Sequence, residues 1–545
     1  MIHRGNEAQG KTNRRVAMFN GKRLSGWMAL AVFATVGGAM VAADPAFAKT
    51  DVDKLTISGE IRERYEVRTN ASFRSVANGA GQGVKGNESV GSHRLRVGIG
   101  YDLTPDVSFF AQISDARYFG SEGAVAGSGA AAVSTQNNNS NGVDLHQGYI
   151  QLKNVLVPGL SLKAGRQEII FGDHRLFGNF GWSQIGNAFD GVRFTQSTQA
   201  ADVDLFWARI VDPTAVAAGA AGQPAILFPA SSTATQSTNT QDIYGAYVTL
   251  KPVKNWTIEP YFFLLQDARA VGASSILTAQ AQGQTRHFLG GRVNGKAGGL
   301  DFTYEGNYQF GSIDSQCFRT FTAAACGGPG VGTGTGRDAR INASQHAVKT
   351  GYTFEAVPMK PRLGFEFNYA SGDKCANGSG AVNGCAEGKS HFNTADNLYP
   401  TNHFHYGYMD LMSWKNMVNY QVMFDVKPSP VSKLQFNYIM HRLANTADNW
   451  YRAGQVAYAT SRVTNQEASL GQELDVHYWH TFKEKFKFEI GFGHFFTGKY
   501  LENSASAVTN GTSGAATLNG TAFTAGTEST LVDQNWGYVM GSILF

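Results

Sequence analysis

Long apolar runs are almost absent from this chain of 545 residues. The one candidate, residues 27–41, is short and is interrupted by Gly37-Gly38. A transmembrane helix needs about 20 consecutive apolar residues, which argues against a helical membrane protein. Proline is also scarce, with 14 residues, whereas glycine is abundant, with 64. This balance suits strands that bend and close on themselves.

Motifs of nucleotide and nucleic-acid binding are absent as well, so we expect no nucleic-acid partner. A barrel enzyme would need a serine or paired acids held by a histidine on neighbouring strands. His477 shares a strand face with Asp475, but no serine can be placed beside it, and a hydrogen bond inside the barrel is the simpler interpretation. We therefore expect no enzyme, no cofactor and no metal.

Cysteine is limited to four residues, which form two close pairs in Gly-rich loops: Cys317 with Cys326 and Cys375 with Cys385. An oxidising compartment favours two local disulfides. Zinc is the rival interpretation, but the spacing fits no common zinc pattern.

The N-terminus has the composition of a removable export signal. Basic residues precede the apolar run, and Ala46-Phe47-Ala48 follows it as a small-x-small cleavage sequence. We predict that residues 1–48 are a signal peptide and that residues 49–545 form one barrel domain. Removal of the signal leaves 40 of the 46 basic and 40 of the 42 acidic residues. The mature chain is therefore neutral, and attraction for an anion would require a local cluster of cations.

The most abundant feature of the sequence is an alternation of apolar and polar residues over about ten positions, followed by a turn. In residues 300–310, LDFTYEGNYQF, one face carries Leu, Phe, Tyr, Tyr and Phe, and the other carries Asp, Thr, Glu, Asn and Gln. A strand places successive side chains on opposite faces. A sheet with one oily and one wet face, repeated this often, fits a membrane barrel with a watery lumen.

Eighteen segments show this pattern, and their connections alternate between long and short. We predict an all-β fold, a single transmembrane antiparallel β-barrel of about 18 strands in the bacterial outer membrane, with long outer loops and short periplasmic turns. The terminal Phe545 on an alternating strand resembles the assembly signal of such barrels. The predicted strands are 54–68, 91–103, 106–117, 144–153, 160–169, 189–196, 201–211, 241–251, 255–267, 285–297, 299–312, 343–356, 361–372, 412–426, 432–443, 470–483, 486–498 and 533–545.

Several arginines lie on the polar faces of these strands. An arginine that faces lipid costs about 2–4 kcal/mol at the membrane midplane, which favours turning these side chains into the lumen. Guanidinium groups in a narrow polar tube form an anion site suited to carboxylates. The alternative is a ladder of arginines and acids that only holds the wall in shape. The arginines on these faces are Arg62, Arg64, Arg94, Arg96, Arg292 and Arg362.

The densest motif is GRQEIIFGDHRLFGN at residues 165–179, which continues to FDGVR at residues 189–193. Its alternation breaks, so we expect a bulge or an inward fold near Gly165. Such a segment would carry Arg166, Arg175, Asp190 and Arg193 towards the pore axis. An ordinary Gly-rich outer loop is the alternative.

This motif resembles the alginate-export family of outer-membrane porins. Supporting matches are GEIRERY at 59–65, RLR at 94–96, DLHQGY at 144–149, YPTNHFHYGYMDL at 399–411 and GFGHFFTG at 491–498. The resemblance implies an eighteen-stranded monomeric barrel whose arginine-rich constriction passes a polyuronate. It places the basic residues of the constriction at Arg62, Arg94, Arg166, Arg175, Arg193 and Arg362, and the modulating acids at Asp173 and Asp190.

We therefore expect a channel for an anionic polysaccharide such as alginate. A diffusion porin for small anionic or other nutrients is the first alternative, and a surface enzyme or adhesin anchored by the barrel is the second. The expected partners are membrane lipid and lipopolysaccharide, the polysaccharide itself, the barrel-assembly machinery and periplasmic export proteins.

Overall fold

The structure is a computed structural model that describes residues 52–70, 74–76, 88–119, 141–211, 240–267, 284–313, 339–374, 391–455, 457–459, 467–503, 517–518, 521–522, 528–531 and 533–545. The predicted signal peptide and all four cysteines lie outside these residues.

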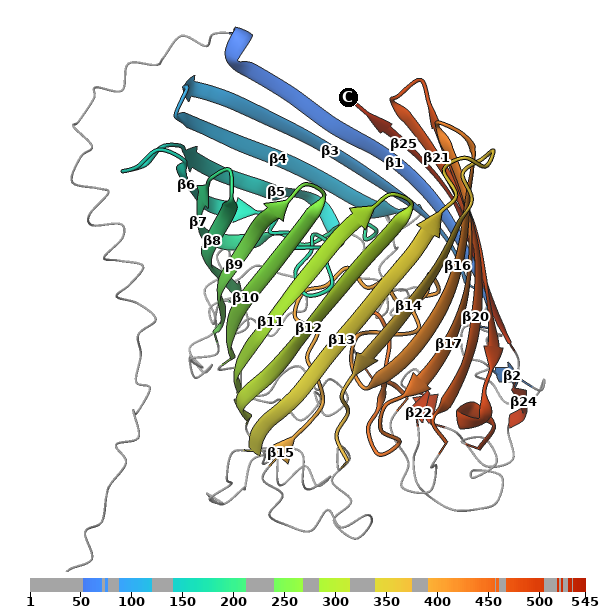
Figure 1. The fold of residues 1–545 in the computed structure, drawn as a ribbon. Helices are drawn as coiled ribbons and strands as arrows, with labels where there is room; N and C mark the ends of the chain where they lie inside the picture. The colour runs from blue at the N-terminus through green and yellow to red at the C-terminus, as the bar shows by residue number, and fades with distance from the viewer. Residues whose placement is uncertain are drawn as a thin grey trace, which may run out of the picture. The chain divides into compact units, whose positions relative to one another are not determined.

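Eighteen long strands form one antiparallel sheet, and the sheet closes because the first strand, β1, pairs with both β3 and the last strand, β25 (Figure 1). This confirms the predicted fold class and strand number. The barrel strands are β1 (Leu55–Thr69), β3 (Glu88–Thr104), β4 (Val107–Tyr118), β5 (Asn141–Leu152), β6 (Leu160–Gln167), β7 (Phe189–Ser197), β8 (Ala201–Val211), β9 (Gln241–Val253), β10 (Trp256–Asp267), β11 (Gln284–Ala297), β12 (Leu300–Ile313), β13 (Ala339–Thr353), β14 (Arg362–Ala370), β16 (Met417–Ser429), β17 (Ser432–Leu443), β20 (Ser469–Phe482), β21 (Phe486–Thr497) and β25 (Gln534–Leu544).

Short elements accompany the barrel. β15 (His391–Phe392) lies parallel to β13, and the 3-10 helix η1 (Val52–Lys54) precedes β1. Residues 499–503 are helical. Across the described segments, the chain has no helix of sufficient length and apolarity to span a bilayer. The other short strands are β2 (Arg74–Val76), β18 (Trp450–Tyr451), β19 (Ala457–Ala459), β22 (Thr517–Leu518), β23 (Thr521–Ala522) and β24 (Glu528–Leu531).

The strand ends follow the predicted ranges closely, with one clear error. The range 412–426 begins too early, because β16 starts at Met417 and the preceding residues belong to a loop that folds into the barrel. Trp414 in that loop is fully buried, and its indole N–H donates to the Tyr369 carbonyl at 3.0 Å. A buried apolar residue next to a strand has the same local pattern as the strand itself, so the alternation could not separate the two.

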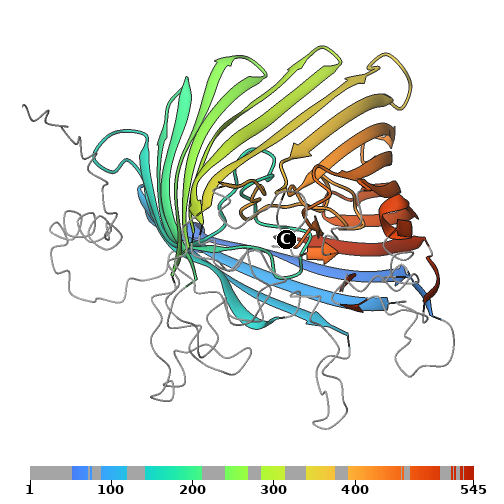
Figure 2. The same cartoon turned by 90° about the horizontal axis from the view of Figure 1, so that it is seen from below.

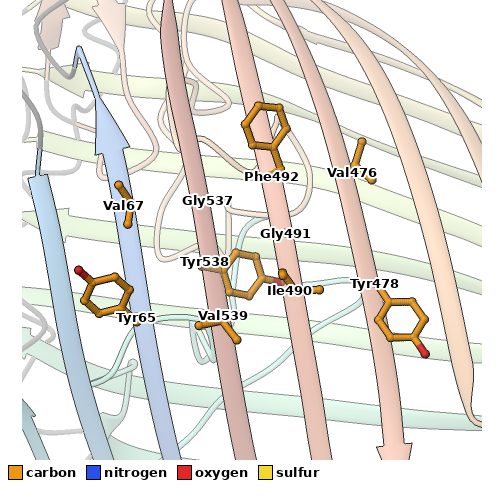
Figure 3. Close-up of a pocket in the computed structure, with 10 residues that line it drawn as sticks. All are labelled: Tyr65, Val67, Val476, Tyr478, Ile490, Gly491, Phe492, Gly537, Tyr538 and Val539. Carbon is orange, nitrogen blue, oxygen red and sulfur yellow. The ribbon is translucent and has the colours of Figure 1, made fainter.

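The two faces of the wall differ as the alternation predicts. On β12, the side chains of Glu305, Asn307 and Gln309 are buried inside the barrel, whereas Tyr308 and Phe310 are exposed on the outside. The outer surface also has an apolar groove over β20, β21, β25 and β1, where Gly537 leaves a gap (Figure 3). Because this groove faces away from the lumen, it is not a site for a polar solute.

The described residues of two long connections turn into the lumen. The first inward loop is residues 168–188, between β6 and β7, and the second inward loop is residues 371–416, between β14 and β16, described at 371–374 and 391–416. Figure 2 shows the corresponding teal and orange segments inside the ring of strands. The two loops meet at a bridge between Phe177 and Tyr399, where the Gly178 N–H donates to the Tyr399 carbonyl at 2.9 Å.

Candidate functional site

The first inward loop is attached to β1 by the guanidinium of Arg62. This group donates to the carbonyls of Gly181 at 2.8 Å and Ser183 at 2.9 Å, and to Oε1 of Gln184 at 2.7 and 2.9 Å. Carbonyl oxygens of an irregular loop need donors when they are buried, and the planar guanidinium supplies several in one plane. Arg62 is 4% exposed, so it faces the lumen but lies beneath the loop.

Three further arginines of the same wall act on the same loop. Arg64 donates to the Trp182 carbonyl at 2.6 Å and lies over the Trp182 ring. Arg94 donates to the Ser183 carbonyl at 2.9 Å and forms an ion pair with Glu60. Arg96 donates to the Ile185 carbonyl at 2.6 Å. All four arginines turn inward, as their strand faces predict, and they are buried against the loop backbone.

The other half of the first inward loop is held by aromatic packing. Phe171 stacks on Tyr247 of β9 at 4.4 Å between ring centroids, and it also contacts Phe206 of β8 and Phe263 of β10. Phe177 packs against the same aromatic group. The loop is therefore a strap that runs from the β1–β3 wall to the β8–β10 wall, with polar attachment at one end and apolar attachment at the other.

The second inward loop is held by acceptors as well as by donors such as Arg68, which donates to the Met409 carbonyl at 2.9 Å. Two buried carboxylates on β20 accept from the loop backbone: Glu473 from the Met409 N–H at 2.9 Å and Asp475 from the Tyr408 N–H at 3.3 Å. Gly407 is required here, because its φ is +103° and a Cβ would lie 2.5 Å from the Glu473 carboxylate.

Asp173, Arg175 and Arg292 lie where the first inward loop crosses the β11–β14 wall. Asp173 is 3.6 Å from both arginines, and Arg175 bonds to Glu366 at 2.5 Å. Arg292 also pairs with Glu259 at 2.8 Å. Both arginines thus have carboxylate partners, and Arg175 is 1% exposed.

The pKa values of two loop residues reflect this arrangement. Burial opposes the ionisation of Asp173, but the charges of Arg175 and Arg292 more than offset it and hold the pKa of Asp173 well below its usual value. Burial and the Arg175 charge lower the pKa of His405 to about 3. His405 is therefore neutral at pH 7, and its Nε2 lies 2.7 Å from the Asp173 carbonyl.

Arg166 and Asp190 are not near the pore axis, which corrects the prediction. The two residues lie opposite each other on β6 and β7, at the rim that carries the long loops. Arg166 also lies opposite Gly148 of β5, and Gly148 is on the same outer face as the exposed Ile150. Gly165 has the expected unusual backbone, with φ +125°. The alternation nevertheless continues through it, so Arg166 stays on the outside.

Arg193 does face the lumen, where it pairs with Asp204 at 2.8 Å. Arg362 also faces the lumen and bonds to Asp301 at 2.7 Å and Asp425 at 3.3 Å. Its guanidinium lies over Gly351 and Gly364, where any Cβ would be within 2.5 Å of it. The two glycines therefore make room for a flat cation on the wall.

In four lumen ion pairs of the described residues, the cation is clearly more exposed than the carboxylate that neutralises it; one of them is Lys251 with Asp202, at 41% and 28%. Lysines that the sequence reasoning did not select take part: Lys349 bonds to Glu366 at 3.3 Å, and Lys433 bonds to Asp425 at 3.1 Å. On their own strands, Lys349 alternates with outward Val348 and Lys433 with outward Leu434, and this was the signal that could have found them. The side-chain exposures in the other three pairs are 23% for Arg193 and 7% for Asp204, 32% for Lys349 and 1% for Glu366, and 38% for Lys433 and 10% for Asp425.

His477 and Asp475 share the lumen face of β20, as the sequence indicates, and both are fully buried. Nδ1 of His477 lies 3.3 Å from the Tyr538 hydroxyl, and the ring packs on Tyr408. Within the described residues, Nε2 of His477 has no hydrogen-bond partner, so no nucleophile is paired with it.

Comparisons with known structures find outer-membrane porins. OccAB1 of Acinetobacter baumannii is 12% identical, with a TM-score of 0.51 over 92% of this chain and 99% of that chain. OprD of Pseudomonas aeruginosa is 10% identical, with a TM-score of 0.46 over 92% of this chain and 98% of that chain. At 12% identity, the similarity to OccAB1 shows only that the two chains share a fold. No curated protein sequence matches the chain.

The sequence itself matches one family model, described as alginate export, over residues 53–514. That range contains seventeen of the eighteen barrel strands and both inward loops. The porin fold and the family match together place the barrel in the bacterial outer membrane. The chain belongs to the alginate export family.

Proposed function

We propose that this barrel is a channel for anionic polysaccharide, with alginate or a similar polyuronate as its substrate. The observation that carries the proposal is the difference in exposure within the lumen ion pairs. Arg193, Lys349 and Lys433 project into the lumen, while their carboxylate partners lie against the wall. At these three pairs, a passing solute therefore meets the positive group first, although the mature chain is neutral overall.

The partial neutralisation of these cations serves conduction. A polymer must bind weakly enough at each position to leave it again. We propose outward transport driven by the gradient of polymer and by periplasmic export proteins, in a channel that works as a monomer. The barrel-assembly machinery and outer-leaflet lipopolysaccharide remain the other expected partners. Catalysis forms no part of the proposal.

Planar-bilayer recording tests the proposal. We expect a current that is selective for anions and that polyuronate blocks. Glutamine at Arg193, Lys349 and Lys433 together should lower the anion-to-cation permeability ratio by several fold, because the wall carboxylates remain. Cation selectivity of the wild-type channel, or an unchanged ratio in the triple variant, would refute it.

Uptake of small anions is the second candidate function, and the strap across the lumen favours it. A loop attached to opposite walls narrows the passage and suits small solutes better than a polymer. Block by oligouronates of increasing length distinguishes the two. Export of a polymer predicts that affinity rises with length, whereas uptake of small anions predicts that permeation ceases beyond one or two sugar rings.

A further inference from the structure

We infer that the lumen wall near the short turns holds a binding subsite for one carboxylated sugar ring, built on Trp479 and Lys433. This inference rests on the proposed function and makes it specific, because it names where a uronate first binds. Trp479 of β20 and Lys433 of β17 are paired in register on the lumen face. The Lys433 ammonium lies 5.3 Å from the centre of the indole ring.

The indole is fixed in position and partly open to the lumen. Its Nε1–H donates to Glu489 of the next strand at 3.1 Å, and the imidazole of His477 stacks beside it at 5.4 Å. The ring is thus oriented by a polar contact at its edge and leaves apolar surface uncovered. The flat C–H face of a pyranose packs on such a surface, as other apolar faces do on aromatic rings.

The carboxylate of that sugar has a cation within reach. Lys433 bonds to Asp425 at 3.1 Å, and Asp425 also accepts from Arg362 at 3.3 Å. Arg362 also bonds to Asp301, and Lys349 bonds to Glu366, so Lys433 is the cation that a ligand can reach: its side chain is 38% exposed, against 10% for Asp425. A neutral sugar would use only the indole, so the site discriminates in favour of a uronate.

The subsite is also the first step of an aromatic path towards the loops. From Trp479 the rings continue through His477 to Tyr408 at 3.7 Å, then to His403 at 5.1 Å. The path ends at Trp182 of the first inward loop, which stacks on His403 at 3.9 Å and 11°. Trp479, Tyr408 and Trp182 are partly exposed, and the histidines between them are buried. A polymer that binds at Trp479 therefore lies at one end of a line of rings that leads to the first inward loop.

The test is block of single-channel current by oligouronates and by neutral oligosaccharides of equal length, added on the short-turn side. We expect Trp479→Ala to weaken block by both sugars about tenfold, which corresponds to about 1.4 kcal/mol. Lys433→Gln should weaken only block by the oligouronate, by a similar factor. Trp479→Phe should recover most of the affinity for both sugars. That recovery would show that the weaker block in Trp479→Ala comes from loss of the aromatic ring and not from misfolding. Trp256→Ala, an outward tryptophan on β10, and Lys251→Gln, a lumen lysine paired with Asp202, are the matched controls.

The outcomes separate the two proposals. If the wild-type channel is anion-selective and blocked by oligouronates, but Trp479→Ala and Lys433→Gln bind them within twofold of wild type, the subsite is wrong and the proposed function stands. If Lys433→Gln weakens block by both sugars equally, the carboxylate contact is wrong. If the wild-type channel shows neither anion selectivity nor block, both proposals fail.

Discussion

At the scale of single residues, arginines with the same sequence pattern have different roles. Arg62 and Arg193 both lie on polar strand faces, and both turn inward. Arg62 is buried beneath loop carbonyls, whereas Arg193 is exposed to the lumen. The alternation predicts the face of a strand because it is local. It cannot predict the partner, because the carbonyls that bind Arg62 are 119 to 121 residues away in the chain.

The role of Arg62 as an attachment point leads to a prediction. Arg62→Lys keeps the charge but replaces a planar fork with one ammonium, which cannot reach Gly181, Ser183 and Gln184 together. We expect the strap to lose on the order of 2 kcal/mol of its local stability. Hydrogen exchange of residues 181–185 should become faster and the open-channel current noisier, with anion selectivity unchanged.

The same substitution at Arg166 is the matched control. Arg166 is on the outer surface, 3.5 Å from Asp190, so Arg166→Lys should leave both exchange and current at wild-type values. Faster exchange in the control, or an unchanged strap in Arg62→Lys, would contradict the role given to Arg62.

At the scale of elements, the strands were more predictable than the loops. Strand periodicity recurs every two residues, and the sequence carries it without tertiary information. The inward loops depend on contacts with distant walls, such as Phe171 with Tyr247 and Met409 with Glu473. The GRQEIIFGDHRLFGN motif correctly predicted an inward fold, but it placed Arg166 on the wrong face, because a positive φ at Gly165 did not shift the register.

The junction of the two inward loops should be sensitive to acid. His405 is buried with a pKa of about 3, and the charged groups that face it are Arg175, Asp173, Glu366 and Lys349. A released loop would expose His405 with an ordinary pKa near 6.5, so the released state binds more protons between about pH 6.5 and pH 3. The docked loop is therefore most stable above pH 6.5, and it loses up to about 1.4 kcal/mol for each pH unit below that value.

Single-channel recording between pH 7 and pH 4.5 measures this effect as an increase in gating events. His405→Gln removes the titration, and its amide N–H can still donate to the Asp173 carbonyl, so the response to acid should shrink. His346→Gln on the outer face of β13 is the control and should respond to acid as the wild type does. An undiminished response in His405→Gln would show that another group titrates.

At the scale of the whole molecule, closure of the barrel depends on the two ends of the chain. β1 pairs with β25 from Glu60 to Thr69, and the backbones of Gly59 and Phe545 exchange hydrogen bonds at 2.8 and 3.1 Å. A Cβ at Gly59 would lie 2.4 Å from the Phe545 ring and 2.5 Å from the Arg96 carbonyl. The terminal phenylalanine, expected from the sequence to serve assembly, thus also packs at the seam.

Gly59→Val should therefore weaken the seam. The added side chain must displace both the Phe545 ring and the β3 backbone, and overpacking of this kind costs about 1–3 kcal/mol. We expect a lower midpoint of denaturant unfolding in detergent and a smaller folded fraction on gels run without heating. Gly454→Ala is the matched control, because a Cβ there meets no atom within 4 Å and its stability should equal that of the wild type. If Gly59→Val folds as well as this control, the contact between Gly59 and the Phe545 ring does not hold the seam, and closure rests on the β1–β25 hydrogen bonds alone.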